Sequence, residues 1–146
     1  MDHTRTNELL RLLEEDARLE PATIATMMGV TEAEVREAIA KLEKEKVILK
    51  YPALINWDKT DGKGTVTAMI EVKVTPQRDV GFDQIASRIY KFPEVQSVYL
   101  MSGSYDLSIV IEGDSIKDIA FFVSQKLSTL DNVISTATHF ILKKYK

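Results

Sequence analysis

The sequence predicts an α+β protein with an N-terminal winged helix-turn-helix domain, a hinge strand and a C-terminal ferredoxin-like βαββαβ domain. Two observations lead to this prediction. Apolar residues recur at helical spacing through the first 50 residues of the chain. From Thr65 onward, segments of period two and of helical period follow in the order strand, helix, strand, strand, helix, strand.

The first two expected elements are helices. A stripe of leucines from Leu9 to Leu13 predicts a helix over residues 4–15. Pro21 suits the first turn of a second helix, where its missing N–H costs nothing. Gly29 can end that helix because glycine readily takes a positive φ.

The third helix begins with a capping signal. Thr31 can cap it, and Glu34, three residues later, completes a capping box. Apolar residues then follow at i, i+3, i+4 and i+7, namely Val35, Ala38, Ile39 and Leu42. With the second helix and the turn at Gly29, this element forms a helix-turn-helix pattern.

An extended segment is expected after the third helix. Residues 47–49 predict a short strand or the end of a wing, and residues 51–57 should be extended because Pro52 disfavours α geometry before it. Residues 58–64 are polar and indicate a turn or linker. The expected parts are a helix-turn-helix domain over 1–50, a hinge strand and linker over 51–64, and a ferredoxin-like domain over 65–146.

The C-terminal domain should be a four-stranded sheet with helices on one face only. Strands are expected over 65–74, 95–102, 106–112 and 133–143, and helices over 81–91 and 116–127, the second capped by Asp114. The uncovered face should carry apolar residues such as Met69, Val98, Leu100 and Val110. Because a bare apolar face usually has a partner, we expect a homodimer through it, with Trp57 packed against the partner chain.

Composition and charge limit the class of protein. The chain has no run of about 18 apolar residues and no signal-peptide pattern at its start, so no membrane helix or membrane partner is expected. Zero Cys removes thiolate chemistry, and a cytoplasmic location is the simplest interpretation. His3 and His139 are far apart and no phosphate loop or ligand cluster accompanies them. We therefore expect no enzyme activity, cofactor or metal.

The charge of the N-terminal part allows two interpretations. Residues 1–50 contain eight Lys and Arg against eleven Asp and Glu, which opposes strong binding to DNA phosphates. From Arg36 to Lys50, however, five basic residues stand against three acidic ones. The early glutamates can also be explained by helix stability, through the dipole and the i, i+4 pairs Glu32–Arg36 and Glu37–Lys41. The residues alone leave a DNA-reading helix and a plain solvated helix equally open.

Two stretches carry a resemblance to a known family. They are "LLRLLEEDARLEPATIATMMGVTEAEVREAIAKLEKEKVI" and "VYLMSGSYDLSIVIEG", in the order helix-turn-helix, hinge and βαββαβ domain. Over essentially its whole length the chain resembles the Lrp/AsnC family of bacterial and archaeal transcriptional regulators. It departs from that family at Lys46, where Gly is common, and in its third helix, where only Arg36 and Lys41 are basic.

The resemblance implies double-stranded DNA as a partner and the third helix as its reader. Arg36 is then the best candidate for a base contact, with Thr31 and Lys41 as candidates for phosphate contacts. The DNA-binding surface would extend along the basic residues that follow, Lys44, Lys46 and Lys50.

The turn from Ser102 to Asp106 is a candidate effector site. Gly, Ser and Asp are also what any hairpin turn favours, so the turn chemistry alone explains them. For an amino acid effector, the N–H groups of Gly103 and Ser104 could bind the carboxylate and Asp106 the ammonium. The resemblance places this loop in a small-molecule cleft between dimers, which adds Tyr105 and, as weaker candidates on the last strand, Thr136 and Thr138.

Together these features predict a sequence-specific DNA-binding transcriptional regulator that responds to a small molecule, an amino acid by resemblance. It should act as a homodimer, or as a tetramer or octamer. The alternative is a small-molecule sensor or scaffold with weak or no DNA binding, whose acidic N-terminal domain contacts another protein.

Overall fold

The computed structural model describes residues 1–76 and 81–146. The chain divides into two compact units, Met1–Asn56 and Trp57–Lys146. The boundary between them falls inside the segment expected as a hinge and linker, and the three-part division remains a prediction.

The first unit is built from three helices around one small core. Asp2 caps the first helix by accepting the Arg5 N–H at 2.9 Å. Gly29 ends the second with φ 65°, the left-handed conformation that its position was expected to need. Leu9, Ile24 and Val35, one from each helix, are 0% exposed. The helices are α1 (His3–Glu15), α2 (Pro21–Met28) and α3 (Glu32–Lys44).

The expected wing strand is not found after α3. Instead α3 ends in a Schellman motif, in which the Val47 N–H donates to the Leu42 carbonyl at 2.9 Å and the Lys46 N–H to the Glu43 carbonyl at 3.1 Å. This motif requires a left-handed residue, and Lys46 supplies it with φ 60°. Because the chain turns back onto the helix, residues 47–49 form no strand, and residues 51–56 are exposed without strand pairing in the described chain.

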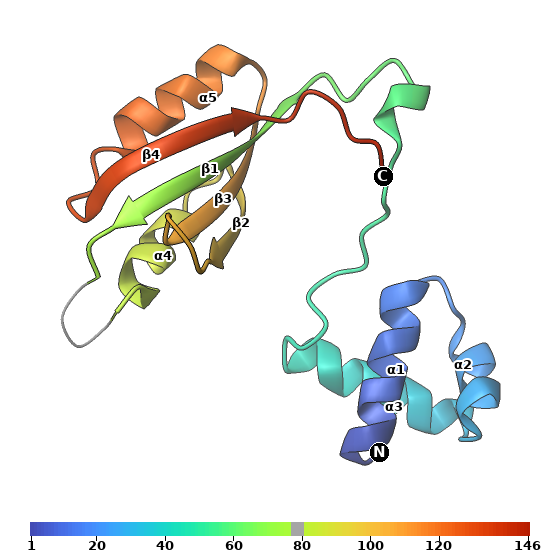
Figure 1. The fold of residues 1–146 in the computed structure, drawn as a ribbon. Helices are drawn as coiled ribbons and strands as arrows, with labels where there is room; N and C mark the ends of the chain where they lie inside the picture. Colours follow the sequence, from blue (N-terminus) through green and yellow to red (C-terminus); the bar gives the residue numbers. More distant parts are fainter. Residues whose placement is uncertain (77–80) are drawn as a thin grey trace. The chain divides into compact units, whose positions relative to one another are not determined.

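The second unit is a four-stranded antiparallel sheet with helices on one face (Figure 1). The strand order is β2-β3-β1-β4, so the two middle strands come from different βαβ halves. Trp57 lies in a short 3-10 helix rather than in an extended strand. The elements are η1 (Trp57–Lys59), β1 (Val66–Val74), α4 (Asp83–Tyr90), β2 (Val95–Leu100), β3 (Leu107–Gly113), α5 (Ile116–Phe122), η2 (Val123–Leu127) and β4 (Val133–Phe140).

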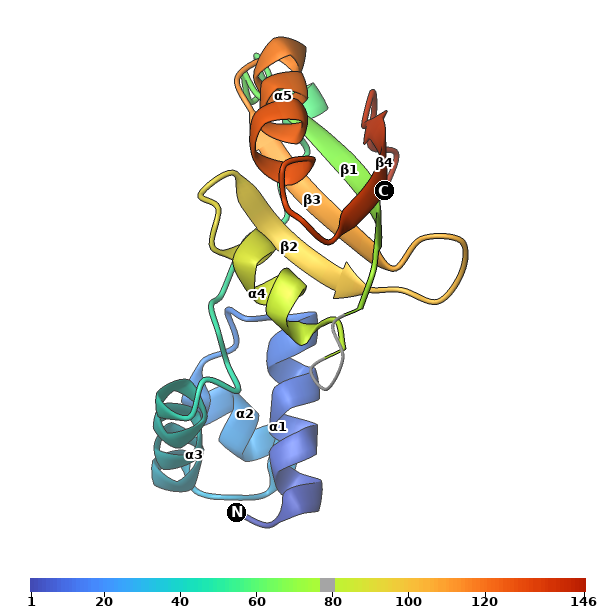
Figure 2. The same ribbon diagram turned by 90° about the vertical axis from the view of Figure 1, so that its left-hand side faces the viewer.

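Buried and less buried residues alternate along β1, and the buried ones mark the face of the sheet that forms the core. Ala68, Ile70 and Val72 are 0% exposed, and α4 and α5 lie on the same side of the sheet (Figure 2). Their side chains pack with this face into one apolar cluster, in which the rings of Phe92 and Phe122 meet edge to face at 5.5 Å. The residues between them on β1 point to the uncovered face.

Two of the four residues expected on the uncovered face are on the other one. Met69 pairs with Val110, and both lie on the uncovered face as predicted. Val98 and Leu100 instead pair with the buried residues Ile109 and Leu107. The register of β2 shifts between Val95 and Ser97, and this irregularity reverses which residues of the strand point toward the helices.

The last helix differs from expectation at both ends. Its N-cap is Ser115, whose hydroxyl accepts the Asp118 N–H at 3.1 Å, and not Asp114. Its second half, η2, is a π-helix, in which the Ser128 N–H reaches back five residues to the Val123 carbonyl at 2.8 Å.

Candidate functional site

The start of α3 is held by its own acidic residue. The Glu34 carboxylate accepts hydrogen bonds from the Thr31 backbone N–H and hydroxyl, each at 2.8 Å, and the Glu34 N–H donates to the Thr31 hydroxyl at 3.3 Å. The backbone hydrogen bond, followed by the hydroxyl, lowers the pKa of Glu34. The capping box predicted from the sequence is therefore confirmed, and the Thr31 hydroxyl is already engaged within the helix start.

Ion pairs along α3 agree only in part with the sequence. Arg36 pairs with Glu32 at 2.6 Å, as predicted. Lys41 pairs with Glu45 at 3.9 Å and not with Glu37. Both pairs lie on the surface, and each such pair contributes only about 0.3–0.5 kcal/mol. The two cations are therefore weakly held and can turn to another anion at small cost.

The solvent side of α3 is suited to close approach by a flat or grooved surface. Ala33 and Ala40 lie two turns apart on the side opposite the buried Val35, and both are exposed. Their small side chains leave the helix backbone accessible. Arg36 and Lys44 lie beside them and are also exposed, as is Glu37, so this side of the helix presents two cations and one carboxylate around a smooth centre.

The remaining candidate lysines follow the end of α3. Lys44 belongs to the last turn of the helix, where a cation favours the helix dipole. Lys46 occupies the left-handed position of the Schellman motif. Lys50 lies in the exposed segment beyond it. All three are exposed, so three cations lie around the end of α3, together with Glu43 and Glu45.

A tyrosine connects the segment after α3 to the helix itself. The Tyr51 hydroxyl donates to the Glu43 carboxylate at 2.7 Å. Partial desolvation, together with this hydrogen bond and the charge of Glu43, raises the pKa of Tyr51 to about 12. This contact is not predictable from the sequence, because its i, i+8 spacing matches no local helix or turn pattern.

The candidate effector turn is tied to the central strand β1. The Asp106 carboxylate accepts the Val74 N–H at 2.9 Å, and the Asp106 N–H donates to the Val72 carbonyl at 3.0 Å. Lys73 reaches the Ser104 carbonyl at 3.4 Å. Gly103 has φ 130°, which few other residues adopt. Asp106 thus has a structural role, and one of its oxygens is used by the backbone.

The structure places the other effector candidates around the same end of β1. Ser102 and Gly103 are exposed, and Tyr105 is half-buried. Thr136 is paired with Val72, so it lies across β1 from Asp106. Thr138 pairs with Ile70, two residues further along the strand. Both threonines share the sheet side of the buried core residues, and both are half-buried.

The described residues form neither a metal-binding cluster nor a membrane-spanning helix. Over residues 1–76 and 81–146, no group of three or more His, Asp or Glu is arranged to hold a metal ion. In the same described ranges, no helix has the length and apolar character that crossing a bilayer requires.

The second unit matches a described family. Residues 67–146, more than half of the chain, match the Lrp/AsnC ligand binding domain. The chain belongs to the Lrp/AsnC family. It is also 62% identical, over 142 residues, to the HTH-type transcriptional regulator YugG of Bacillus subtilis, covering 97% of this chain and 86% of that protein.

Two solved structures of Lrp/AsnC-like fold extend over the whole chain. The leucine response regulatory protein LrpA of Mycobacterium tuberculosis aligns with a TM-score of 0.74 at 23% identity, covering 100% of this chain and 95% of that one. A transcriptional regulator of Neisseria meningitidis in complex with L-Met aligns with a TM-score of 0.69 at 22% identity, covering 100% and 92%. At these identities the likeness establishes the fold, and the family match establishes a transcriptional regulator with a ligand-binding domain.

Lys46 generates the first prediction for this Lrp/AsnC chain. A non-glycine residue in the left-handed region costs about 1–2 kcal/mol, part of which glycine returns through its freer unfolded state. Lys46→Gly should therefore raise the free energy of unfolding by about 0.5 kcal/mol. Urea unfolding followed by circular dichroism measures this free energy. Lys50→Gly, at an exposed position without a positive φ, is the control and should not raise the free energy of unfolding. A lower free energy of unfolding for Lys46→Gly would contradict backbone strain at Lys46.

Tyr51 generates a pH prediction. Its folded-state pKa is raised from 10.0 to about 12, so the protonated hydroxyl favours folding. Its contribution is fully present below pH 10 and is lost as the pH rises toward 12. The stability difference between the natural chain and Tyr51→Phe should therefore shrink over this range. A difference that stays constant with pH would show that the Tyr51–Glu43 contact does not form in solution.

Proposed function

We propose that this regulator binds double-stranded DNA directly through α3 and that an amino acid bound near the Ser102–Asp106 turn changes this binding. The solvent side of α3 supports direct DNA binding, because Arg36 and Lys44 flank two alanines there. An α-helix with such a side fits the major groove of B-DNA.

The proposed contacts follow from exposure and pairing. Arg36 is 62% exposed and can exchange its Glu32 partner for a base edge. Lys41, Lys44, Lys46 and Lys50 are proposed to contact phosphates, because a flexible ammonium group suits a backbone anion. Thr31 would contribute through its place at the helix start, where N–H groups favour a phosphate.

Assembly into a homodimer is part of the proposal. The segment after α3 exposes large apolar side chains, including Leu49, Leu54 and Trp57, which are 79%, 80% and 42% exposed. On the uncovered sheet face, Met69 and Tyr99 are 42% and 54% exposed. Such surfaces favour burial against a second copy. Tetramers and octamers of these dimers remain part of the same proposal.

An amino acid is proposed as the effector. The family's domain binds a ligand, and the Neisseria relative was solved with L-Met. In this chain, Asp106 offers a carboxylate for the ammonium, and the exposed backbone at Gly103 and Ser104 offers N–H donors for the carboxylate, with Ser102 beside them. Tyr105, Thr136 and Thr138 complete the proposed surroundings.

The regulation would follow from linkage. An effector that favours one assembly, or one spacing of the α3 pairs, must change DNA affinity by the same factor by which DNA changes effector affinity. Two copies of α3 held at a fixed spacing also bind more tightly than one, which offsets the small charge of each.

A second candidate is a sensor or scaffold with weak or no DNA binding. The excess of acidic residues over residues 1–50 favours it. Its first unit would then contact another protein. Binding to plain duplex DNA that is weak and nearly independent of salt would favour this candidate.

Variants of α3 test DNA binding. On duplex DNA from upstream of the protein's own gene, Arg36→Ala should weaken binding about ten-fold, the value of one good base contact. Glu37→Gln should strengthen it, because it removes a carboxylate from the same side. Fluorescence anisotropy over a salt series measures both, with Arg11→Ala on α1 as the matched control. Equal affinities for the Arg36→Ala and Arg11→Ala variants would remove Arg36 from the interface.

Variants of Asp106 test the effector site. Asp106→Asn keeps a carbonyl oxygen for the Val74 N–H but removes the charge that an ammonium needs. We expect this variant to fold normally and to lose about ten-fold or more in amino acid affinity, typical of a charged hydrogen bond. Asp106→Ala should instead lower stability, since it also leaves the Val74 N–H unpaired. Thermal shift with each of the twenty amino acids measures both effects, and undiminished shifts for Asp106→Asn would leave Asp106 purely structural.

A further inference from the structure

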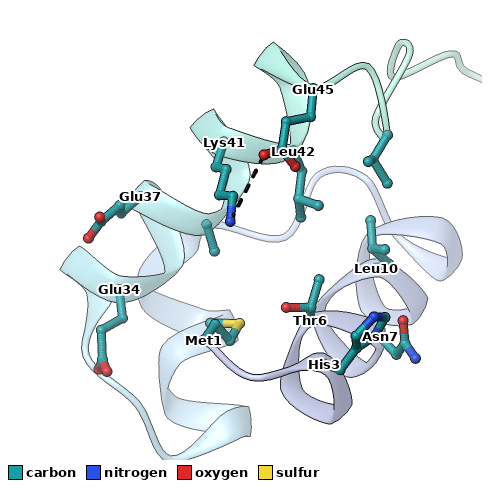
Figure 3. Close-up of a pocket in the computed structure, with 12 residues that line it drawn as sticks. Met1, His3, Thr6, Asn7, Leu10, Glu34, Glu37, Lys41, Leu42 and Glu45 are labelled. Atoms are coloured by element: carbon teal, nitrogen blue, oxygen red, sulfur yellow. Dashed lines mark ion pairs between the residues drawn. The ribbon is translucent and has the colours of Figure 1, made fainter.

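A groove runs between α1 and α3 in the first unit (Figure 3). It has a volume of about 560 Å³, enough for two or three large side chains. Its apolar lining comes from Met1, Leu10, Ala38, Leu42 and Val47. None of these apolar residues belongs to the solvent side of α3 that is proposed to meet DNA, but Glu37 and Lys41 of the lining do, so the groove borders that surface.

The rim of this groove is acidic. Glu34, Glu37 and Glu45 line it, against one lysine, Lys41, which Figure 3 shows turned toward Glu45. Glu34 stays ionised, because its hydrogen bonds with Thr31 lower its pKa. In the described part of the chain, Glu37 has neither an ion pair nor a hydrogen bond to its carboxylate. An apolar floor with an acidic rim suits an amphipathic segment that carries positive charge.

The segment over residues 141–146 has that character. Leu142 and Tyr145 are 93% and 89% exposed, and Lys143, Lys144 and Lys146 lie among them. In a polyproline-type conformation the spacing of three would place Leu142 and Tyr145 on one side of the segment. The Lys143 ammonium lies over the Tyr145 ring, 5.2 Å from its centre. Large apolar side chains exposed to this degree favour burial against another surface.

We propose that the groove between α1 and α3 binds the segment 141–146 of a second copy of this chain. Leu142 and Tyr145 enter the apolar floor, and the three lysines meet Glu34, Glu37 and Glu45. The complementarity of both charge and apolar pattern selects this segment as the occupant. If α3 binds DNA as proposed above, the docked lysines would also offset carboxylates that repel the phosphates.

The absence of cysteine from the sequence allows a direct test. A size-tagged Glu37→Cys chain is mixed with an untagged Lys144→Cys chain under mild oxidation, without DNA or amino acid. A disulfide forms only where the two Cα atoms come within about 7 Å. We expect a tagged–untagged dimer at a yield at least about five-fold above that of an Arg11→Cys control, which lies on α1 outside the groove lining.

High salt and one further variant separate the charged from the apolar contribution to binding. High salt should lower the yield, because it screens the lysine–glutamate contacts. Replacing Leu142 and Tyr145 with Ser should lower it as well. Equal yields from Glu37→Cys and Arg11→Cys would overturn the proposal. So would a double Glu37→Cys/Lys144→Cys chain that cross-links only within itself, since the chain's own segment would then be the occupant. Because no DNA is present, these outcomes are independent of whether α3 binds DNA.

Discussion

Strand β1 is the constraint on which the second unit depends, because it pairs with β3 on one side and β4 on the other. Its alternate residues assign every paired residue to one face of the sheet. Ile70 fixes Ile109 and Thr138 on the side of the helices, while Met69 fixes Val110 and His139 on the uncovered side. The positions of Thr136 and Thr138, two of the effector candidates, follow from this register. The Asp106 carboxylate then fixes where β1 ends, by binding the Val74 N–H beside the register shift of β4.

Local signals in the sequence were sufficient for most of the fold. Thr31 and Glu34 predict the start of α3, and Gly29 predicts the end of α2, because capping depends on residues within a few positions of each other. The order of strands and helices follows from the change between period two and helical period. Register does not follow from such patterns. The irregularity between Val95 and Ser97 is invisible in the sequence, and it moved Val98 to the covered face.

The residues of the candidate sites could be predicted from the sequence, but not all of their hydrogen-bond and ion-pair partners could. The sequence indicated that Asp106 is a turn residue with a free carboxylate, whereas its partner Val74 is 32 residues away and is known only from the fold. In α3 and its C-cap, each of four glutamates has a side-chain or backbone partner: Glu32 binds Arg36, Glu34 binds Thr31, Glu43 binds Tyr51 and Glu45 binds Lys41. Within the described residues, Glu37 is the one glutamate of this helix whose carboxylate has no such contact. Most of the acidic side chains therefore stabilise the helix and its surroundings.

The π-helix at Val123–Leu127 has a consequence for how this chain aligns with others. Each of its hydrogen bonds spans five residues where an α-helix spans four, so the segment holds one residue more than a regular helix between the same two ends. That extra residue lets Leu127 reach the core while Lys126 meets Glu94. A relative with a regular helix here would need one residue fewer, and an alignment without a gap would pair its core leucine with the wrong position of this chain.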